Sequence, residues 1–372
     1  MRVLVIGAGL TGCTLARLMK DKNYLVSIKE KQNYIGGLCY TTTSTNGILY
    51  EPFGGHAFHT NDPRIREFVL QFSEFNDYFH RKGIIINGIL RPFPLSKDTI
   101  LQMENGKQIL KEIDERPDIP DLTNFETYAI SQFGNTLYKL FIYNYSKKMW
   151  GLEPAKLTTE YIRNRIEMKE HNTQMFDDYF QGLPIRGYTE FLRNMIQDIP
   201  IQLRISRYDE SSYDLILYSG RIDELFKFKF GNLQFRSLLF EYKENENWEN
   251  LNYGSINLPQ HKRYIRKVNF NVMYKQKNDN SWIQYQEPVA HNDNNLPLYP
   301  IYTKRNLKSF DKYLIEACKS DKIIPVGRLG LYKYLEMGQA INLAMNMMPL
   351  IENWKKFSPK ERYSEIKTLL NS

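Results

Sequence analysis

The chain has 372 residues, of which 42% are hydrophobic and 25% charged, so its composition excludes a disordered or fibrous protein and allows two or three domains. Its 50 basic and 42 acidic residues give a net charge of +8 that is spread along the chain without a zinc finger, an RNP motif or a basic arm, so nucleic acid is not expected as a partner. The apolar runs are too short for a membrane span and no secretory signal is recognisable, so we expect a cytoplasmic protein and no membrane partner.

The chain opens with the pattern of a dinucleotide-binding strand–helix–strand unit. A short apolar strand, Arg2–Ile6, leads into Gly-Ala-Gly-Leu-Thr-Gly at residues 7–12; a helix is expected over Leu10–Lys20, and a second strand, Tyr24–Lys29, ends at Glu30. Glycines in this position permit a tight turn and let a pyrophosphate approach the N-terminus of the helix. The acid after the second strand suits a ribose hydroxyl and argues against a 2′-phosphate.

Downstream of this unit the sequence predicts a helix over Pro63–Phe75, a β-hairpin over Tyr78–Phe93 that turns at an Asn-Gly pair, and a helical region over 96–150. Asn135–Trp150 carries apolar or aromatic residues on nearly all faces, which is typical of a buried helix or of one that lines a cleft. The later part is strand-rich. We expect helices over Gly187–Ile196 and Gly338–Leu350, and strands over Ile201–Ser206, Asp214–Tyr218, Gln234–Glu241, Ser255–Leu258, Val268–Lys275 and Ile323–Gly327.

The three cysteines, Cys13, Cys39 and Cys318, lack the spacing of a metal site or a disulfide framework. We therefore expect no structural metal and a reducing compartment.

Two further segments favour FAD over NAD. Beyond Glu30, Lys31 leads to a second glycine pair, Gly36-Gly37, in an order that resembles flavoproteins of the amine-oxidase type. Near the C-terminus Gly327-Arg328 follows a predicted strand, also as in those flavoproteins. Three such segments far apart in the chain predict a bound FAD.

A third glycine-rich segment, Gly54–Thr60, contains two histidines three positions apart, His56 and His59. No third residue with matching spacing completes a metal site. Contact with a flavin or a sugar is the better interpretation.

Together these and other segments resemble the UDP-galactopyranose mutase family over nearly the whole chain. The matching segments are the N-terminal fingerprint with Gly36-Gly37, Gly55–Asp62, Phe93–Leu95, Tyr145–Gly151, Gln181–Pro184, Gly187–Thr189, Phe235–Leu238, Leu298–Pro300, Gly327–Leu329 and Tyr332–Met337.

The resemblance implies an α/β fold, in which a Rossmann-like FAD-binding domain carries an inserted helical domain and an antiparallel β-sheet domain. The implied boundaries are 1–65, 184–222 and 304–350 for the FAD-binding domain, 95–155 for the helical domain with a mobile substrate segment, 66–94, 156–183 and 223–303 for the sheet domain, and 351–372 for a peripheral tail. The resemblance also suggests a homodimer and a nicotinamide cofactor as external reductant.

As function, the resemblance implies an isomerase that interconverts the pyranose and furanose forms of a nucleoside-diphosphate hexose for a bacterial surface polysaccharide. In the family scheme, N5 of reduced FAD displaces the nucleotide from the anomeric carbon, and the covalent flavin–sugar adduct opens and recloses through the 4-hydroxyl. UDP-galactopyranose is the first expected substrate. The alternatives are dTDP-fucopyranose, UDP-N-acetylgalactosamine and, more distantly, the chemistry of a flavin amine oxidase-like oxidoreductase.

The motif matches assign expected roles to individual residues. Arg266 matches an arginine that grips the diphosphate, a task that suits a guanidinium fork. With His59, Tyr299 and Tyr334 it forms the expected catalytic set. The expected substrate contacts are His56, Tyr145, Trp150, Lys169, Arg266, Tyr299, Tyr334 and Glu336, and the expected FAD contacts are Gly7, Gly9, Gly12, Glu30, Lys31, Gly36, Gly37, His56, Arg328 and Met337.

Two departures from the family pattern fall in the expected substrate region. The family's second phosphate arginine lies in an Arg-Ile-Pro-x-Arg context, where this chain has Arg165–Glu170, and Lys169 is the expected substitute as a point charge. Glu336 stands where the family has aspartate. Both changes favour retained chemistry on an altered substrate.

A protein that only binds sugar nucleotides is the competing class. It would need no FAD, so a colourless purified protein would favour it.

Overall fold

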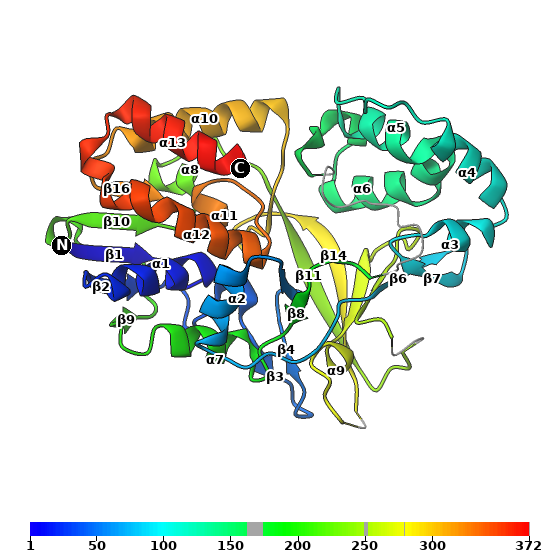
Figure 1. Ribbon diagram of the computed structural model, residues 1–372, viewed down its shortest axis with the longest axis horizontal. Coiled ribbons are helices and arrows are strands. Elements are labelled where there is room, and N and C mark those ends of the chain that lie inside the picture. The colour runs from blue at the N-terminus through cyan, green and yellow to red at the C-terminus, as the bar shows by residue number, and fades with distance from the viewer. Residues whose placement is uncertain (162–173, 249–251, 279, 372) are drawn as a thin grey trace.

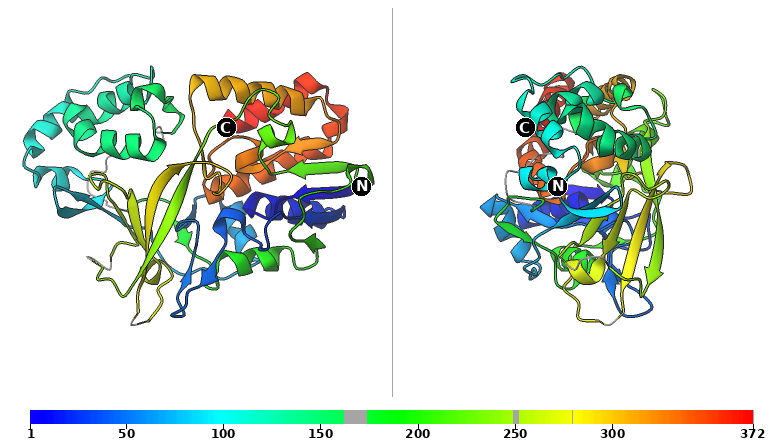
Figure 2. Two further views of the ribbon diagram at one scale, coloured as in Figure 1. Left: turned by 180° about the vertical axis from the view of Figure 1, so that it is seen from behind. Right: turned by 90° about the vertical axis from the view of Figure 1, so that its right-hand side faces the viewer.

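The computed structural model describes residues 1–161, 174–248, 252–278 and 280–371. A five-stranded sheet with its helices, a seven-stranded sheet and a cluster of helices make up the molecule, and the seven-stranded sheet lies between the other two parts (Figure 1 and Figure 2). None of the helices in these ranges is long and apolar enough to span a bilayer.

The five-stranded sheet is parallel and has the order β16-β10-β1-β2-β9. β1 (Arg2–Ile6) lies at its centre and is buried because its apolar side chains face helices on both sides. The other strands are β2 (Leu25–Lys29), β9 (Ile201–Gln202), β10 (Leu215–Tyr218) and β16 (Ile323–Pro325). The sheet is thus assembled from three separated stretches of chain, as a Rossmann-like fold with insertions requires.

Helices cover this sheet. α1 (Leu10–Asp21) packs against α12 (Met337–Glu352) and α7 (Gly187–Met195). The remaining helices of this part are α2 (Pro63–Leu70), α8 (Ile222–Leu225), α10 (Lys304–Cys318), α11 (Gly327–Gly330) and α13 (Pro359–Asn371).

The predicted helix over Pro63–Phe75 is too long, because the chain leaves the helix after Leu70 so that Phe72 and Phe75 can pack against Phe191 of α7.

The tail after residue 351, expected to be peripheral, needs correction. α13 packs against α10 and α12, and the buried Arg362 donates hydrogen bonds to the backbone carbonyls of Trp354 and Cys318. The N-terminal part of α13, with the buried Arg362 and Ile366, therefore belongs to the core of this part of the molecule.

The seven-stranded sheet has the order β15-β11-β14-β13-β12-β6-β7 and is antiparallel except between β12 and β6. β6 and β7 form the predicted hairpin, with Asn87 and Gly88 at positive φ in the turn. Its strands are β6 (Lys82–Ile86), β7 (Ile89–Phe93), β11 (Phe235–Glu244), β12 (Ser255–Asn257), β13 (Arg266–Asn269), β14 (Trp282–Ala290) and β15 (Tyr299–Pro300).

The predicted strand Val268–Lys275 is wrong beyond Asn269. The Asn269 side chain accepts hydrogen bonds from the amides of Asn271 and Val272 and starts the short helix α9 (Phe270–Met273). Of the predicted strand Ile201–Ser206, only Ile201–Gln202 pairs with the sheet.

The helical part contains α3 (Lys97–Leu101), α4 (Gly106–Asp114), α5 (Phe125–Leu137) and α6 (Tyr143–Trp150), with a π-helical turn at Tyr138–Ile142. Two short two-stranded sheets complete the fold: β3 (Thr42–Thr43) with β4 (Leu49–Tyr50), and β5 (Phe58–Thr60) with β8 (Phe180–Gly182).

α6 is anchored at its C-terminal end by two cations. The Lys148 ammonium donates to the backbone carbonyls of Leu258 at 2.9 Å and Tyr264 at 2.7 Å, and also to those of Pro259 and His261. Arg236 of β11 donates to the Met149 carbonyl at 2.7 Å. Both contacts fix α6 against the seven-stranded sheet.

Candidate active site

Two cavities share a wall at the junction of the three parts. The first, of about 550 Å³, surrounds the Gly7–Gly12 loop and is called here the dinucleotide cavity. The second, of about 500 Å³, contains Arg266 and is called the arginine cavity. The side chains common to both are His56, Arg328, Leu335 and Met337. The two cavities are therefore adjacent, and these four residues face both of them.

The expected cofactor residues all line the dinucleotide cavity: Gly7, Gly9, Gly12, Glu30, Lys31, Gly36, Gly37, His56, Arg328 and Met337. The expected substrate residues that the structure describes all line the arginine cavity: His56, His59, Tyr145, Trp150, Arg266, Tyr299, Tyr334 and Glu336. Lys169 and the rest of the predicted mobile segment over Arg165–Glu170 lie outside the described residues.

The glycine loop of the dinucleotide cavity is shaped for close approach. A Cβ at Gly12 would lie 2.0 Å from the Gly7 carbonyl oxygen, so only glycine closes this turn. At Gly9 the nearest atom to such a Cβ is 3.8 Å away, in Gly37, so the small residue here leaves room on the cavity side. Gly9 also caps α1, whose N-terminal amides face the cavity. These features fit a bound pyrophosphate.

Glu30 lies at the carboxyl end of β2, at the rim of the dinucleotide cavity. Its Oε2 accepts a hydrogen bond from the Ala8 amide and its Oε1 one from the Gln32 amide, both at 2.7 Å. Because each carboxylate oxygen has a second lone pair, the group can still accept a ribose hydroxyl.

The wall between the cavities is held by backbone contacts. Arg328 donates to the carbonyls of Leu298 at 3.1 Å and Leu335 at 2.8 Å, and its guanidinium lies 4.5 Å from the ring centre of Tyr334. Met337 begins α12, so the positive end of this helix points at the same wall.

His56 is oriented by a buried acid, Glu51, which was not among the predicted site residues. Its Nδ1 lies 2.7 Å from Oε2 of Glu51, and the Tyr274 hydroxyl donates to Oε1 at 3.1 Å. Burial raises the pKa of Glu51, although the hydrogen bonds from His56 and Tyr274 oppose this shift. Its place five residues before His56, in an apolar stretch, was a weak signal.

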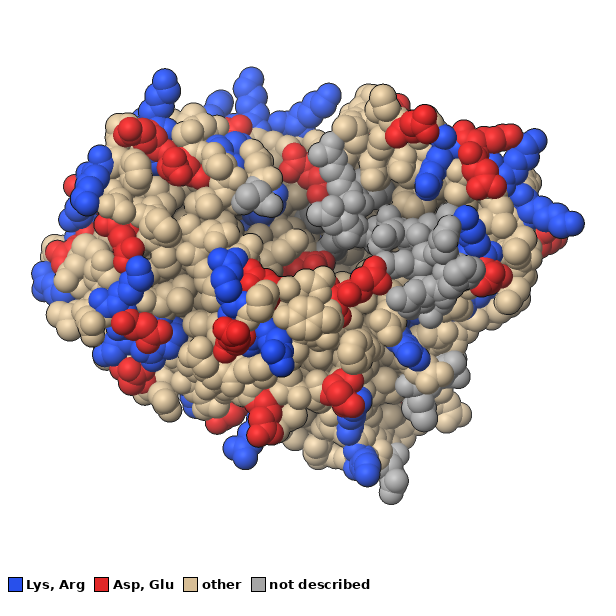
Figure 3. Space-filling model, viewed as in Figure 1, with Lys and Arg blue, Asp and Glu red and all other residues tan. Residues whose placement is uncertain are grey.

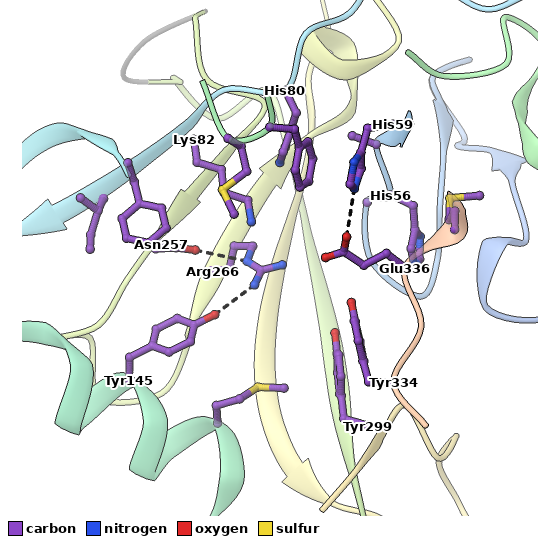
Figure 4. Close-up of a pocket in the computed structure, with 18 of the residues that line it drawn as sticks. His56, His59, His80, Lys82, Tyr145, Asn257, Arg266, Tyr299, Tyr334 and Glu336 are labelled. Atoms are coloured by element: carbon purple, nitrogen blue, oxygen red, sulfur yellow. Dashed lines mark hydrogen bonds and ion pairs between the residues drawn. The ribbon is translucent and has the colours of Figure 1, made fainter. Parts of the chain in front are cut away.

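Arg266 is the centre of the arginine cavity (Figure 4). Its Nη2 donates to the Tyr145 hydroxyl at 3.0 Å and its Nε to Asn257 Oδ1 at 3.3 Å. Among the acidic residues of the described ranges, none forms an ion pair with it. A guanidinium with neutral partners in a cavity is a site for an anion.

Two tyrosines face Arg266 across the cavity (Figure 4). The rings of Tyr299 and Tyr334 stack with centroids 5.9 Å apart, and Trp150 packs edge-on against Tyr299 at 6.2 Å. The result is an aromatic wall with hydroxyl groups at its edge, which suits a phosphate or a sugar.

His59, which also lines the arginine cavity, lies between two carboxylates. Its Nδ1 is 2.8 Å from Asp178 Oδ2, its Nε2 is 3.1 Å from Glu336 Oε2, and its ring stacks on Phe176. Burial alone would lower the pKa of His59, but the interactions with the two acids outweigh it and raise the pKa above its ordinary value.

Asp178, His80 and Lys82 also line the arginine cavity and were not among the predicted site residues. Lys82 lies on β6 and reaches the cavity from the sheet face that carries Arg266, two strands away. Asp178 precedes β8 and is brought to His59 because β8 pairs with β5. Such long-range pairing leaves no pattern in the sequence itself.

No group of three or more His, Cys, Asp and Glu side chains in the described part of the chain is arranged to hold a metal ion. On the face seen in Figure 3, Lys and Arg side chains are interspersed with Asp and Glu and form no single basic patch.

The parallel sheet, its glycine loop and the adjoining cavity define a Rossmann-like dinucleotide-binding protein, and the family model of the NAD(P)-binding Rossmann-like domain matches residues 5–72. The family model of UDP-galactopyranose mutase matches residues 140–334. The chain belongs to the UDP-galactopyranose mutase family, a family of isomerases, as expected from its sequence.

Three relatives illustrate the membership. The chain is 31% identical to the UDP-galactopyranose mutase of Mycoplasma genitalium, over 92% of this chain and 93% of the relative. It is 29% identical to the dTDP-fucopyranose mutase of Escherichia coli, over 95% of this chain and 100% of the relative. A crystal structure of reduced UDP-galactopyranose mutase superposes with a TM-score of 0.73 over 97% of this chain and 98% of that one, at 16% identity, which shows the shared fold.

Proposed function

We propose that this protein interconverts the pyranose and furanose forms of a nucleoside-diphosphate hexose, with reduced FAD as cofactor and UDP-galactopyranose as first substrate. The observation that carries the proposal is the position of Arg266, a cation whose hydrogen-bond partners among the described residues are neutral, in a cavity that shares a wall with the dinucleotide cavity. This arrangement suits a substrate whose diphosphate is bound beside the isoalloxazine end of a flavin.

In this proposal the Gly7–Gly12 loop and the N-terminus of α1 hold the FAD pyrophosphate, and Glu30 accepts a ribose hydroxyl. His56, Arg328 and the Met337 amide lie where the flavin ring would meet the shared wall. A reduced flavin bound there would supply nucleophilic electron density for displacing the nucleotide from the anomeric carbon, while these residues would hold and orient it.

The protein's own task is to hold the leaving diphosphate close to the sugar. Arg266 offers charged N–H donors, while Tyr145, Tyr299 and Tyr334 offer hydroxyl groups around the same point. Retaining the nucleotide in this way allows it to return to the anomeric carbon after the sugar ring has reclosed.

The second candidate substrate is dTDP-fucopyranose. Glu336 is bound to His59 and also caps α12 through a reciprocal pair of contacts with Gln339, so its carboxylate has less capacity for sugar hydroxyls. A hexose without a 6-hydroxyl has one fewer hydroxyl group that needs a hydrogen-bond acceptor. UDP-N-acetylgalactosamine is a third candidate, and a cytoplasmic homodimer reduced by a nicotinamide cofactor is part of the same proposal.

The test is an assay of the purified protein, reduced with dithionite, on UDP-galactofuranose and on dTDP-fucofuranose, with the pyranose product measured by chromatography. We expect a yellow protein that converts one of the two sugars when reduced and neither when oxidised. Preference for the dTDP sugar would select the second candidate. A colourless protein, or a flavoprotein that converts neither of these sugars nor UDP-N-acetylgalactosamine, would refute the proposal.

A further inference from the structure

His59 contacts a carboxylate at both of its ring nitrogens. Nδ1 lies 2.8 Å from Asp178 Oδ2, and Nε2 lies 3.1 Å from Glu336 Oε2, the contact drawn as a dashed line in Figure 4. An ionised carboxylate only accepts hydrogen bonds, so each of the two contacts requires a proton on the nitrogen. The geometry is that of an imidazolium between two acids.

Three elements fix this arrangement before any substrate is bound. His59 lies on β5, which pairs with β8 opposite Gln181. The Gln181 side chain donates to the backbone carbonyls of Phe176 at 3.1 Å and Asp178 at 3.0 Å. The segment that carries Phe176 and Asp178 is thereby held over the histidine, and the ring of Phe176 stacks on it with centroids 3.6 Å apart.

Glu336 is fixed from the other side. It is the N-cap residue of α12, where its side chain accepts from the Gln339 amide while the Gln339 side chain accepts from the Glu336 amide. These contacts at the start of α12 hold the Glu336 carboxylate beside His59, so the ion pair needs no rearrangement of the backbone.

We propose that Asp178 is a positioning residue that holds His59 as an imidazolium, so that Glu336, rather than His59, is the proton acceptor offered to the sugar hydroxyls. This inference rests on the proposed function for the identity of the substrate, but not for the state of His59. An imidazolium has no lone pair to accept a proton, whereas the carboxylate of Glu336 retains acceptor capacity.

The step assigned to Glu336 is a simple proton transfer. When the furanose or pyranose ring closes, the attacking sugar hydroxyl forms its bond to the electron-poor anomeric carbon with an oxygen lone pair. Its O–H bond breaks, the proton goes to a carboxylate oxygen of Glu336, and the O–H electron pair stays on the sugar oxygen as a lone pair. His59, with its charge fixed by Asp178, stabilises the ionised form of Glu336 from which the step begins.

The charges around His59 divide into two groups. On the acidic side, Asp177 and Asp178 precede β8 and Glu336 caps α12. On the basic side, Lys82 of β6 and Arg266 of β13 enter from the sheet.

His80 lies between these acidic and basic groups, two residues before β6 of the β6–β7 hairpin. Burial first, and then the charges of Lys82, Arg266 and His59, lower the pKa of His80 well below its ordinary value. The pKa values of His59 and His80 are thus shifted in opposite directions, upward for His59 and downward for His80.

The direct test is the protonation state of His59, read from its side-chain nitrogen shifts by NMR in the holoprotein, with the signal assigned through His59→Asn. We expect both nitrogens to carry protons at pH 7. In Asp178→Asn the midpoint of the His59 titration, followed through the same nitrogen shifts, should fall by about one pH unit or more, because an opposite charge within hydrogen-bond distance is removed. A neutral His59 at pH 7 in the wild type, or an unchanged midpoint in Asp178→Asn, would overturn the proposal.

Two variants separate this effect from damage to the fold. Asp177→Asn removes the neighbouring charge from the same cavity and should move the midpoint less than Asp178→Asn. Asp178→Glu restores the charge and should bring the midpoint back toward the wild-type value. Glu336→Gln tests the other contact, and it should also lower the midpoint.

The activity readout is the pH profile of kcat on whichever sugar the protein converts. Asp178→Asn should move the alkaline limb to lower pH and leave the acidic limb, set by Glu336, in place. A uniform loss of kcat with both limbs unmoved would assign Asp178 a structural role only. If the NMR result is as expected and no sugar is converted, the proposed function fails while the charge state of His59 stands.

Discussion

Arg266 Nη2 donates a hydrogen bond to the Tyr145 hydroxyl at 3.0 Å, although the two residues are 121 positions apart and belong to different parts of the molecule. Tyr145 lies on α6 of the helical part, and Arg266 begins β13 of the seven-stranded sheet. The orientation of the cation in the arginine cavity therefore depends on how α6 is docked against the sheet.

Arg266→Ala should weaken the binding of UDP or dTDP by about tenfold to a hundredfold, since it removes charge-assisted hydrogen bonds worth about 1.5–3 kcal/mol. Bound flavin, measured by absorbance, should be retained because Arg266 does not line the dinucleotide cavity. Arg263→Ala is the matched control, because Arg263 pairs on the surface with Glu241 and Glu287. Equal affinities of the two variants, measured by calorimetry, would contradict the role of Arg266.

Lys148→Met should lower the free energy of unfolding by about 2–4 kcal/mol, because several backbone carbonyls lose a charged donor at once. Denaturation by urea, followed by circular dichroism, measures the change. Lys147→Met tests the adjacent lysine, whose exposed pair with Glu153 contributes little. A similar loss of stability in both variants would mean that the contacts of Lys148 do not anchor α6.

Gly9→Ala and Gly12→Ala should impair different properties: Gly9→Ala the binding of FAD, and Gly12→Ala the stability of the fold. At Gly12 the added methyl would lie 2.0 Å from the Gly7 carbonyl oxygen, so the turn itself must move and the apoprotein should lose stability. At Gly9 the nearest protein atom to the methyl would be 3.8 Å away, and Gly9 lines the dinucleotide cavity, so the fold should persist while FAD content falls. Flavin absorbance and thermal denaturation distinguish the two, and full FAD content in Gly9→Ala would place the pyrophosphate elsewhere.

The stability that Asp178 confers should depend on pH in a defined direction. The pKa of His59 is raised in the folded protein above its ordinary value of 6.5, so the ion pair stabilises the fold fully below about pH 6.5 and ceases to do so as pH rises through the folded-state pKa. The difference in unfolding free energy between wild type and Asp178→Asn should thus be largest near pH 6 and shrink in alkaline solution. A difference that grows with pH would contradict the charged state of His59.

The sequence predicted the elements whose patterns are local. The strand, glycine loop and helix of residues 2–21, the hairpin at Asn87 and Gly88 and the long helix α12 were all expected, because turn chemistry and apolar periodicity are read within a few residues.

β14, an interior strand of the seven-stranded sheet, was not predicted. Its inward-facing positions include Gln284 and Gln286, which are buried, and Gln284 donates to the backbone carbonyl of Glu51 at 3.0 Å. Polar residues at such positions hide the alternation of a strand. The same limit applies to Asp178 at the site, since only the pairing of β5 with β8 brings it to His59.

The order in which the chain is synthesised has a consequence for cofactor loading. β1 and the glycine loop leave the ribosome well before β16, Arg328 and the start of α12, which complete the sheet and the wall of the dinucleotide cavity. A nascent chain therefore carries the phosphate-binding loop long before it has a closed pocket. A complete dinucleotide cavity therefore requires that Arg328 and the start of α12 have been synthesised, and a chain released before α12 would lack part of the cavity wall however well its first segment folds.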